Sequence, residues 1–172
     1  MINKKLGLAG VAAGVAAVAL WATAYSSNRP EATSESVPAV SSAAADGPAI
    51  TVYRSASCGC CKGWVAHLEE SGFRVEDNVT EDIMDVKREY GVPQTMQSCH
   101  TAVMGDRVIE GHVPAEDILA YRDKSVFNTV GLAVPGMVAG SPGMETGTKQ
   151  DYAVVAFSAN GQSSVYREYT DY

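Results

Sequence analysis

Three of the four cysteines of this chain lie within four positions, at Cys58, Cys60 and Cys61. They stand between two segments of different hydrophobic period. Residues 49–54 are rich in β-branched and aromatic side chains, which indicates a strand, and residues 62–71 carry apolar side chains at helical spacing. The cysteines are therefore predicted to occupy a strand-to-helix turn, and this limits the fold to architectures in which a strand runs directly into a helix.

After that turn the pattern continues to alternate between strand-like and helix-like segments. The expected elements are a strand at 73–79, a helix at 81–90, a hairpin of strands at 101–104 and 107–110, and a helix from 114 to 123. The resulting order, β-α-β-α-β-β-α, predicts an α/β fold of the thioredoxin-like kind. In that fold the first strand-to-helix turn carries a C-x-x-C motif, which agrees with the position of the cysteines.

The chain after residue 130 goes beyond this order. Residues 131–147 are rich in Gly and contain two Pro, which predicts a shaped Gly/Pro/Met loop. Residues 152–158 and 163–169 flank Asn160-Gly161, a strong signal for a β-hairpin. We expect a loop and hairpin extension.

The first 24 residues have the pattern of a targeting segment. Lys4 and Lys5 precede an uncharged, Ala-rich run that ends at an A-x-A-like site, Ala22-Thr23-Ala24. The pattern fits a cleaved signal peptide or an N-terminal anchor in the inner membrane. Residues 25–47 have the composition of a flexible linker, so 48–172 should be one thioredoxin-like domain, located in the periplasm or otherwise outside the cytoplasm.

The charge of the chain argues against nucleic acid as a partner. The first 47 residues carry three basic and three acidic side chains, so the whole net charge of −7 belongs to the remainder. An acidic domain repels a phosphate backbone. Contact with a membrane is expected only through an uncleaved N-terminal segment.

Clustered thiols at the start of a helix suit two kinds of chemistry. The helix dipole stabilises thiolates, which are both nucleophiles in disulfide exchange and ligands for soft metals. In the expected fold the loop that carries Cys99 passes close to the turn, so Cys99 should approach Cys58, Cys60 and Cys61. His100 is adjacent to Cys99.

Three residues outside the cysteine cluster are further candidate ligands. His112 lies in a loop at the same end of the predicted sheet, where helix capping is the alternative role. Met137 and Met144 lie in the Gly/Pro loop, and a thioether is a soft ligand suited to Cu(I). His67 falls late in the predicted first helix and is expected at the surface.

Four collinear motifs make the resemblance to a family specific. The chain resembles the family called domain of unknown function 411, whose members include exported, CopG-like copper-resistance proteins. The motifs are SCGCCKGWVAHLEESGF (57–73), GVPQTMQSCHTAV (91–103), VIEGHVPAEDI (108–118) and GLAVPGMVAGSPGME (131–145). The resemblance implies a thioredoxin-like fold and copper bound by Cys58, Cys60, Cys61 and Cys99, with His112 as a further ligand.

Three functions follow as alternatives. The first is a Cu(I)-binding protein of copper resistance, in which adjacent thiolates hold several ions and other periplasmic copper carriers or exporters are partners. The second is a metal-free thiol-disulfide oxidoreductase, with Cys58 as nucleophile and Cys61 as resolving thiol. The third is a structural zinc site. The sequence leaves open whether the cysteines also act as an oxidoreductase on copper or on thiols.

Overall fold

The computed structural model describes residues 46–124, 128–170 and 172. The predicted targeting segment, 1–24, and nearly all of the predicted linker, 25–47, lie outside these residues, so both stay predictions. Among the described residues, no helix is both long and apolar enough to cross a membrane.

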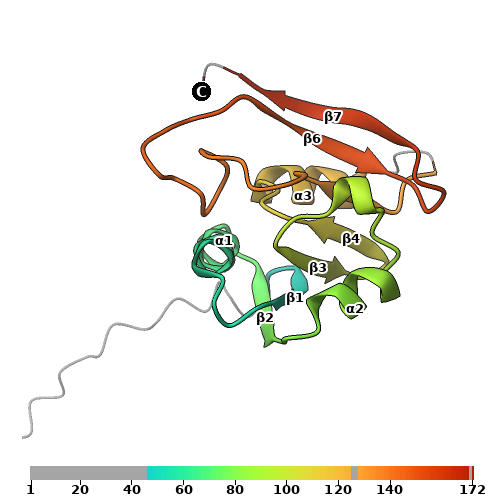
Figure 1. Ribbon diagram of the computed structural model, residues 1–172, viewed down its shortest axis with the longest axis horizontal. Helices are drawn as coiled ribbons and strands as arrows, with labels where there is room; N and C mark the ends of the chain where they lie inside the picture. Colours follow the sequence, from blue (N-terminus) through green and yellow to red (C-terminus); the bar gives the residue numbers. More distant parts are fainter. Residues whose placement is uncertain (1–45, 125–127, 171) are drawn as a thin grey trace, which may run out of the picture. The chain divides into compact units, whose positions relative to one another are not determined.

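The prediction of an α/β fold is confirmed, because helices alternate with the strands of a mixed sheet (Figure 1). Seven strands form one sheet in the order β2-β1-β3-β4-β5-β6-β7. The strands are β1 (Ala49–Arg54), β2 (Arg74–Val79), β3 (His100–Met104), β4 (Arg107–Glu110), β5 (Gly131–Ala133), β6 (Tyr152–Phe157) and β7 (Ser163–Tyr169). The helices are α1 (Gly59–Glu70), α2 (Ile83–Glu89), the 3₁₀ turn η2 (Gln94–Met96) and α3 (Ala115–Asp123).

One strand was not predicted. β5 lies at the start of the segment expected to be a loop, where it pairs in parallel with β4 and antiparallel with β6. At three residues it is too short to produce a period in the sequence. Gly131 permits the close packing, because a Cβ atom there would lie 2.1 Å from the carbonyl oxygen of Val108. Through β5 the predicted hairpin, β6 and β7, becomes part of the main sheet.

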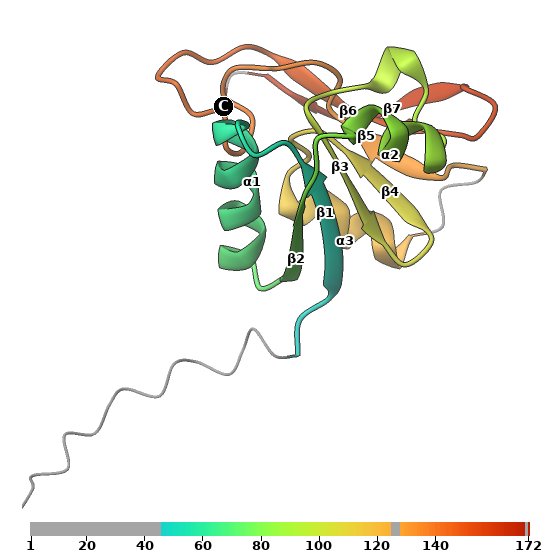
Figure 2. The same cartoon turned by 60° about the horizontal axis from the view of Figure 1, so that its bottom comes forward.

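The two faces of the sheet are covered by different helices. Figure 2 shows α2 in front of the sheet and α3 behind it. Side chains of α1 and α3 share the larger core with inward residues of the strands, and both Trp64 and Tyr121 are fully buried there. A smaller core lies around η2, where Met96 packs with Phe157. At about 25 cal/mol per Å² of apolar surface, burial of these large side chains is a main contribution to stability.

The strand register brings several chain segments to one end of the sheet. Arg54, the last residue of β1, pairs with His100, the first residue of β3. Thr101 pairs with Glu110, the last residue of β4. The turn after β1, the segment before β3 and the loop after β4 therefore meet at the same place.

Candidate metal centre

Helix α1 begins earlier than its apolar pattern predicts. It starts at Gly59 rather than near residue 62, with Cys58 as its N-cap residue. The backbone N–H of Cys58 donates to the carbonyl of Ser55 (3.2 Å), which closes the turn after β1. Cys60 and Cys61 therefore lie in the first helical turn, where Cys61 is buried and Cys60 is half-buried.

The four cysteine sulfurs form one cluster. Cys58 and Cys61 are joined by a disulfide, and Cys60 and Cys99 are free. The sulfur of Cys60 lies 3.5 Å from that of Cys58, and the sulfur of Cys99 lies 3.3 Å from that of Cys61. All four sulfurs lie within 4.8 Å of one another, as a shared metal site requires.

Two histidines extend this cluster on the side of Cys99. The Cys99 sulfur lies 3.2 Å from Nε2 of His112 and 3.3 Å from Nδ1 of His100. Nδ1 of His112 lies 2.7 Å from the carbonyl oxygen of Pro142. Since a carbonyl can only accept, Nδ1 of His112 donates, and in the neutral ring Nε2 keeps a lone pair that faces Cys99.

Burial keeps this part of the site uncharged at neutral pH. Burial, together with negative charge on Cys60 as a smaller cause, raises the pKa of the Cys99 thiol from 9.0 to about 12. Burial lowers the pKa of His112, and that of the fully buried His100 well below its ordinary value. The resting site therefore offers a protonated thiol beside two neutral imidazoles.

Trp64 fixes one wall of the site. Its Nε1–H donates to the carbonyl of Val113 (2.8 Å), and its ring centroid lies 4.3 Å from that of His100. The His100 ring in turn lies with its centroid 4.9 Å from that of His112, edge to face. Helix α1 and both histidines are thus packed as one unit.

A buried ion pair holds the segment before Cys99. Nζ of Lys87 lies 2.5 Å from Oε1 of Glu110, and both side chains are almost completely buried. Glu110 also accepts from the backbone N–H of Ser98 (2.6 Å) and from the hydroxyl of Thr101 (2.7 Å). One carboxylate therefore ties β4 to the residues on both sides of Cys99 and His100. The sequence carries no local signal for this contact. Lys87 lies on α2, and a lysine on an amphipathic helix is ordinarily expected on its exposed face.

The Gly/Pro loop closes over the start of α1. Gly143 has a φ of +80°, and a Cβ atom there would lie 2.5 Å from the backbone nitrogen of Trp64 and 2.7 Å from the carbonyl oxygen of Cys60. The loop backbone therefore lies directly on the first turn of the helix. Met144 follows as a half-buried residue, whereas Met137 exposes half of its surface. Ligation by Met137 and Met144 stays a prediction.

His67 differs from its expected surface position. It is half-buried, and its Nε2 accepts a hydrogen bond from the backbone N–H of Ala115 (3.0 Å), the first residue of α3. His67 thus has the helix-capping role that the sequence suggests as the alternative for His112. The two helices lie 48 residues apart at this contact, so no local pattern could reveal it.

Comparisons with known proteins identify the family of the chain. The family described as "Protein of unknown function, DUF411" matches residues 96–144. Two solved structures of copper resistance protein CopG, Form 2 and Form 1, each share 51% sequence identity with the chain. The match to Form 2 covers 73% of this chain and 100% of that chain, with a TM-score of 0.69. The match to Form 1 covers 72% and 98%, with a TM-score of 0.68.

Among curated proteins no match was found. The alignments with the two solved structures nevertheless cover nearly the full length of their chains, at 51% sequence identity. The four cysteines of the cluster lie at the start of α1 and in the segment just before β3. On this basis the chain belongs to the DUF411 family of copper-resistance proteins, together with CopG.

Proposed function

We propose that this domain binds copper as Cu(I) in copper resistance, once the disulfide between Cys58 and Cys61 is reduced. The observation that carries the proposal is the convergence of four sulfurs within 4.8 Å. Thiolates are soft ligands, and Cu(I) is a soft ion that they select over Ca²⁺ or Mg²⁺. Cys58, Cys60, Cys61 and Cys99 would supply these ligands.

His112 is proposed as a further ligand. Its Nε2 lone pair faces the Cys99 sulfur at 3.2 Å, and Pro142 holds its ring in that orientation through Nδ1. Met137 and Met144 are proposed as outer thioether ligands from the Gly/Pro loop. Their contribution should be smaller, because Met137 exposes half of its surface and is not held in place as the cysteines are.

The spacing of the sulfurs favours more than one copper ion. The sulfur pairs Cys58–Cys60 and Cys61–Cys99 are separated by 3.5 and 3.3 Å. Thiolates this close can bridge neighbouring ions, and four thiolates shared in this way hold several Cu(I) ions rather than one tetrahedral ion. A structural zinc site is less well supported, because thioether ligands add nothing to it.

Thiol redox chemistry is the second candidate function. It is favoured by the disulfide between Cys58 and Cys61, which are spaced as in a C-x-x-C redox pair. The two functions combine in one balanced step. The reduced pair gives up two electrons and two protons as it forms the disulfide, and each electron reduces one Cu(II) to Cu(I).

The wider setting is proposed on the same basis. The order of the first seven main elements and the position of the cysteine turn support a thioredoxin-like fold with a C-terminal extension. The copper-resistance relatives support a role outside the cytoplasm. We propose residues 1–24 as a signal peptide or inner-membrane anchor, 25–47 as a linker, and periplasmic copper carriers or exporters as partners.

Cu(I) titration of the reduced full chain against a competing chelator tests the main proposal. We expect at least one equivalent bound with sub-nanomolar affinity, and loss of that binding in the double variant Cys58→Ser/Cys61→Ser. Ser57→Ala, an exposed substitution in the same turn, is the matched control and should bind as the parent does. Unchanged affinity in the double variant would refute the site, and metal analysis that finds zinc alone would refute copper binding.

The redox candidate is tested separately with the dithiol form, in which the disulfide between Cys58 and Cys61 has first been reduced. A metal-free oxidoreductase reduces insulin or a mixed disulfide at a rate that is independent of copper. If copper instead changes oxidation state as the thiols of Cys58 and Cys61 disappear, in a ratio of one copper to one thiol, the combined step is supported.

A further inference from the structure

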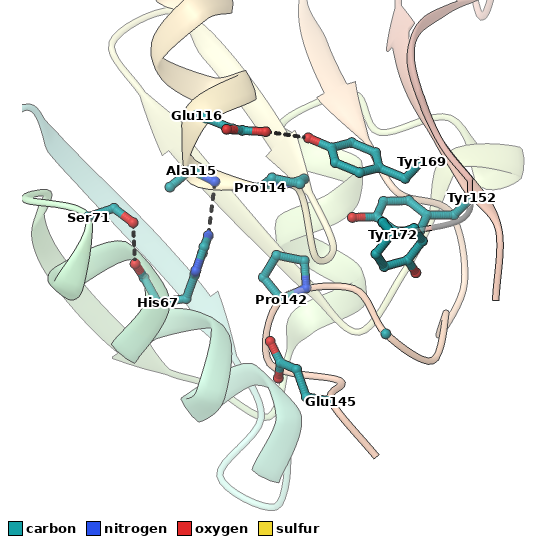
Figure 3. Close-up of a pocket in the computed structure, with 11 residues that line it drawn as sticks. His67, Ser71, Pro114, Ala115, Glu116, Pro142, Glu145, Tyr152, Tyr169 and Tyr172 are labelled. Carbon is teal, nitrogen blue, oxygen red and sulfur yellow. Dashed lines mark hydrogen bonds between the residues drawn. The ribbon is translucent and has the colours of Figure 1, made fainter. Parts of the chain in front are cut away.

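A pocket separate from the cysteine cluster lies between both main helices and the C-terminal hairpin. It has a volume of about 380 Å³ and lies where α1, the start of α3, the Gly/Pro loop and the end of the chain meet. Figure 3 shows three tyrosines together on one side of it and a histidine of α1 across from them. The side chains that matter for its chemistry are His67, Glu116, Glu145, Tyr152, Tyr169 and Tyr172.

The pocket has acidic walls. Among the described residues that line it are the carboxylates Glu116 and Glu145, and none of these lining residues is Lys or Arg. Burial lowers the pKa of His67, so its ring is neutral at pH 7. The pKa of the Tyr152 hydroxyl is raised, first by burial and then by neighbouring groups that include both carboxylates. The interior of the pocket therefore disfavours negative charge.

Basic residues near the pocket compensate only part of this charge. Nε of Arg167 lies 2.6 Å from Oδ1 of the buried Asp117, whereas Nη1 of Arg167 lies 4.0 Å from Oε1 of Glu116. Glu145 has no ion-pair partner within the described part of the chain; its Oε1 accepts from the backbone N–H of Gly143 (3.0 Å). The carboxylate of Glu145 is thus held in place without being neutralised.

The tyrosines form an aromatic wall. The rings of Tyr152 and Tyr169 stack with centroids 4.7 Å apart and an interplanar angle of 7°, and the ring of Tyr172 meets both edge to face. Nζ of Lys149 already lies 4.8 Å from the centroid of Tyr172, so one ring of this cluster attracts a cation in the structure itself. The hydroxyl of Tyr169 donates to Glu116 and Asp117, which links the rings to the carboxylates.

We propose that this pocket binds an organic cation, a guanidinium group held between the tyrosine rings and the carboxylates of Glu116 and Glu145. A guanidinium is planar and weakly hydrated, so it stacks on aromatic faces and bonds to carboxylates at its edge. The proposal is independent of copper binding. The pocket and the cysteine cluster share one neighbour, Pro142. This residue lines the pocket, and its carbonyl oxygen accepts a hydrogen bond from His112. A bound cation would therefore contact a residue of the metal centre.

Matched probes test the proposal on the full chain. Acetyl-arginine amide and acetyl-citrulline amide have the same shape and differ in charge, and their binding is followed by calorimetry and by NMR shifts of the tyrosine ring protons. We expect the arginine probe to bind in the millimolar range or tighter, and at least about tenfold more tightly than the citrulline probe. Equal binding of the two, or no binding at about 10 mM, would overturn the proposal.

Two variants assign the binding to this pocket. Glu145→Gln keeps an oxygen that accepts from the backbone N–H of Gly143 and removes the charge. It should therefore weaken binding of the arginine probe by about threefold or more while the fold is retained. Tyr152→Leu should also weaken binding of the arginine probe, because it removes one of the aromatic rings that line the pocket. Glu81→Gln, at an exposed carboxylate before α2, is the control and should bind like the parent. Unchanged binding in Glu145→Gln contradicts the proposal even if Tyr152→Leu does not fold.

A last comparison distinguishes the two sources of a guanidinium. Agmatine represents a free small molecule, and an acetylated Gly-Arg-Gly amide represents an arginine of a partner protein. If both bind with equal affinity, the pocket recognises the guanidinium alone. If the peptide binds more tightly, the backbone of a partner adds contacts. Either result supports a cation site, and failure of both probes overturns it.

Discussion

The Cys99 sulfur lies 3.2 Å from Nε2 of His112, although the two residues belong to different loops on either side of a hairpin. The antiparallel register of β3 and β4 brings these loops together, and the hydrogen bond from His112 to Pro142 orients the imidazole. The pairing of a half-buried thiol with a neutral imidazole should govern how the proposed site takes up metal.

Cys99 should be unreactive until the pH is high or a metal is bound. Because burial and, to a smaller extent, the charge of Cys60 raise the pKa of Cys99 to about 12, only about one thousandth of the thiolate present at the ordinary pKa of 9.0 forms near pH 8. We expect slow alkylation of Cys99 by iodoacetamide in a Cys60→Ser variant, with a rate that still rises above pH 9, because burial, the larger cause of the raised pKa, remains. Peptide mass spectrometry measures it, and a plateau near pH 9 would contradict the buried environment.

Copper uptake should release protons. The Cys99 thiol is protonated in the metal-free state, since its folded pKa lies above neutral pH, and a thiolate ligand must lose that proton. The affinity for Cu(I) should therefore increase with pH, by up to about tenfold per unit for this one group, throughout the range below its pKa. Chelator competition at several pH values checks this. In Cys99→Ser one proton fewer should be released on copper binding, so the affinity for Cu(I) should rise less steeply with pH.

His112 should contribute more to Cu(I) affinity than either methionine. His112→Phe keeps a ring in the packed site and removes the ligand, so we expect a loss of about tenfold to a hundredfold in affinity. Met137→Leu and Met144→Leu should each cost about tenfold or less. The three variants are compared in the same chelator titration. A larger loss in Met137→Leu than in His112→Phe would reverse the proposed order of ligands.

Gly143→Ala should lift the Gly/Pro loop from helix α1. The added Cβ meets the backbone of Trp64 and Cys60 below 3 Å, and a φ of +80° is strained for alanine. We expect a destabilisation of about 1–3 kcal/mol in urea unfolding, together with weaker Cu(I) binding. Gly147→Ala is the control, because it has a φ of +83° but nothing within 4 Å. It should lower stability only through backbone strain and leave Cu(I) affinity unchanged.

The ion pair of Lys87 and Glu110 should be costly to break from one side. Lys87→Met leaves the buried carboxylate of Glu110 without its cation, and we expect a loss of about 3–5 kcal/mol. The double variant Lys87→Met/Glu110→Gln should recover much of this loss, because no buried charge is then left unpaired. Urea unfolding of the single and double variants measures the coupling. Additive losses would show that the two charges do not interact.

Local sequence patterns determined most of the elements. The strand at 49–54 was predicted with the bounds that the structure has, and the hairpin around residues 105–106 and the final hairpin at Asn160-Gly161 were also confirmed. These features depend on side-chain alternation and on turn residues that act within a few positions. The cluster of Cys58, Cys60 and Cys61 was likewise visible from spacing alone.

Only the tertiary structure decided what surrounds those cysteines. The contacts of Cys99 with Cys61 and His112, the capping of α3 by His67, and the ion pair of Lys87 with Glu110 join residues that lie 13 to 48 positions apart. Each depends on sheet register and helix packing, which no local period encodes. The three-residue strand β5 escaped prediction for the same reason: neighbouring strands, rather than its own sequence, hold it in the sheet. Thus the sequence determined that three thiols lie together at the start of a helix, and the packing of distant segments decided that they form a partly buried centre with Cys99 and two histidines.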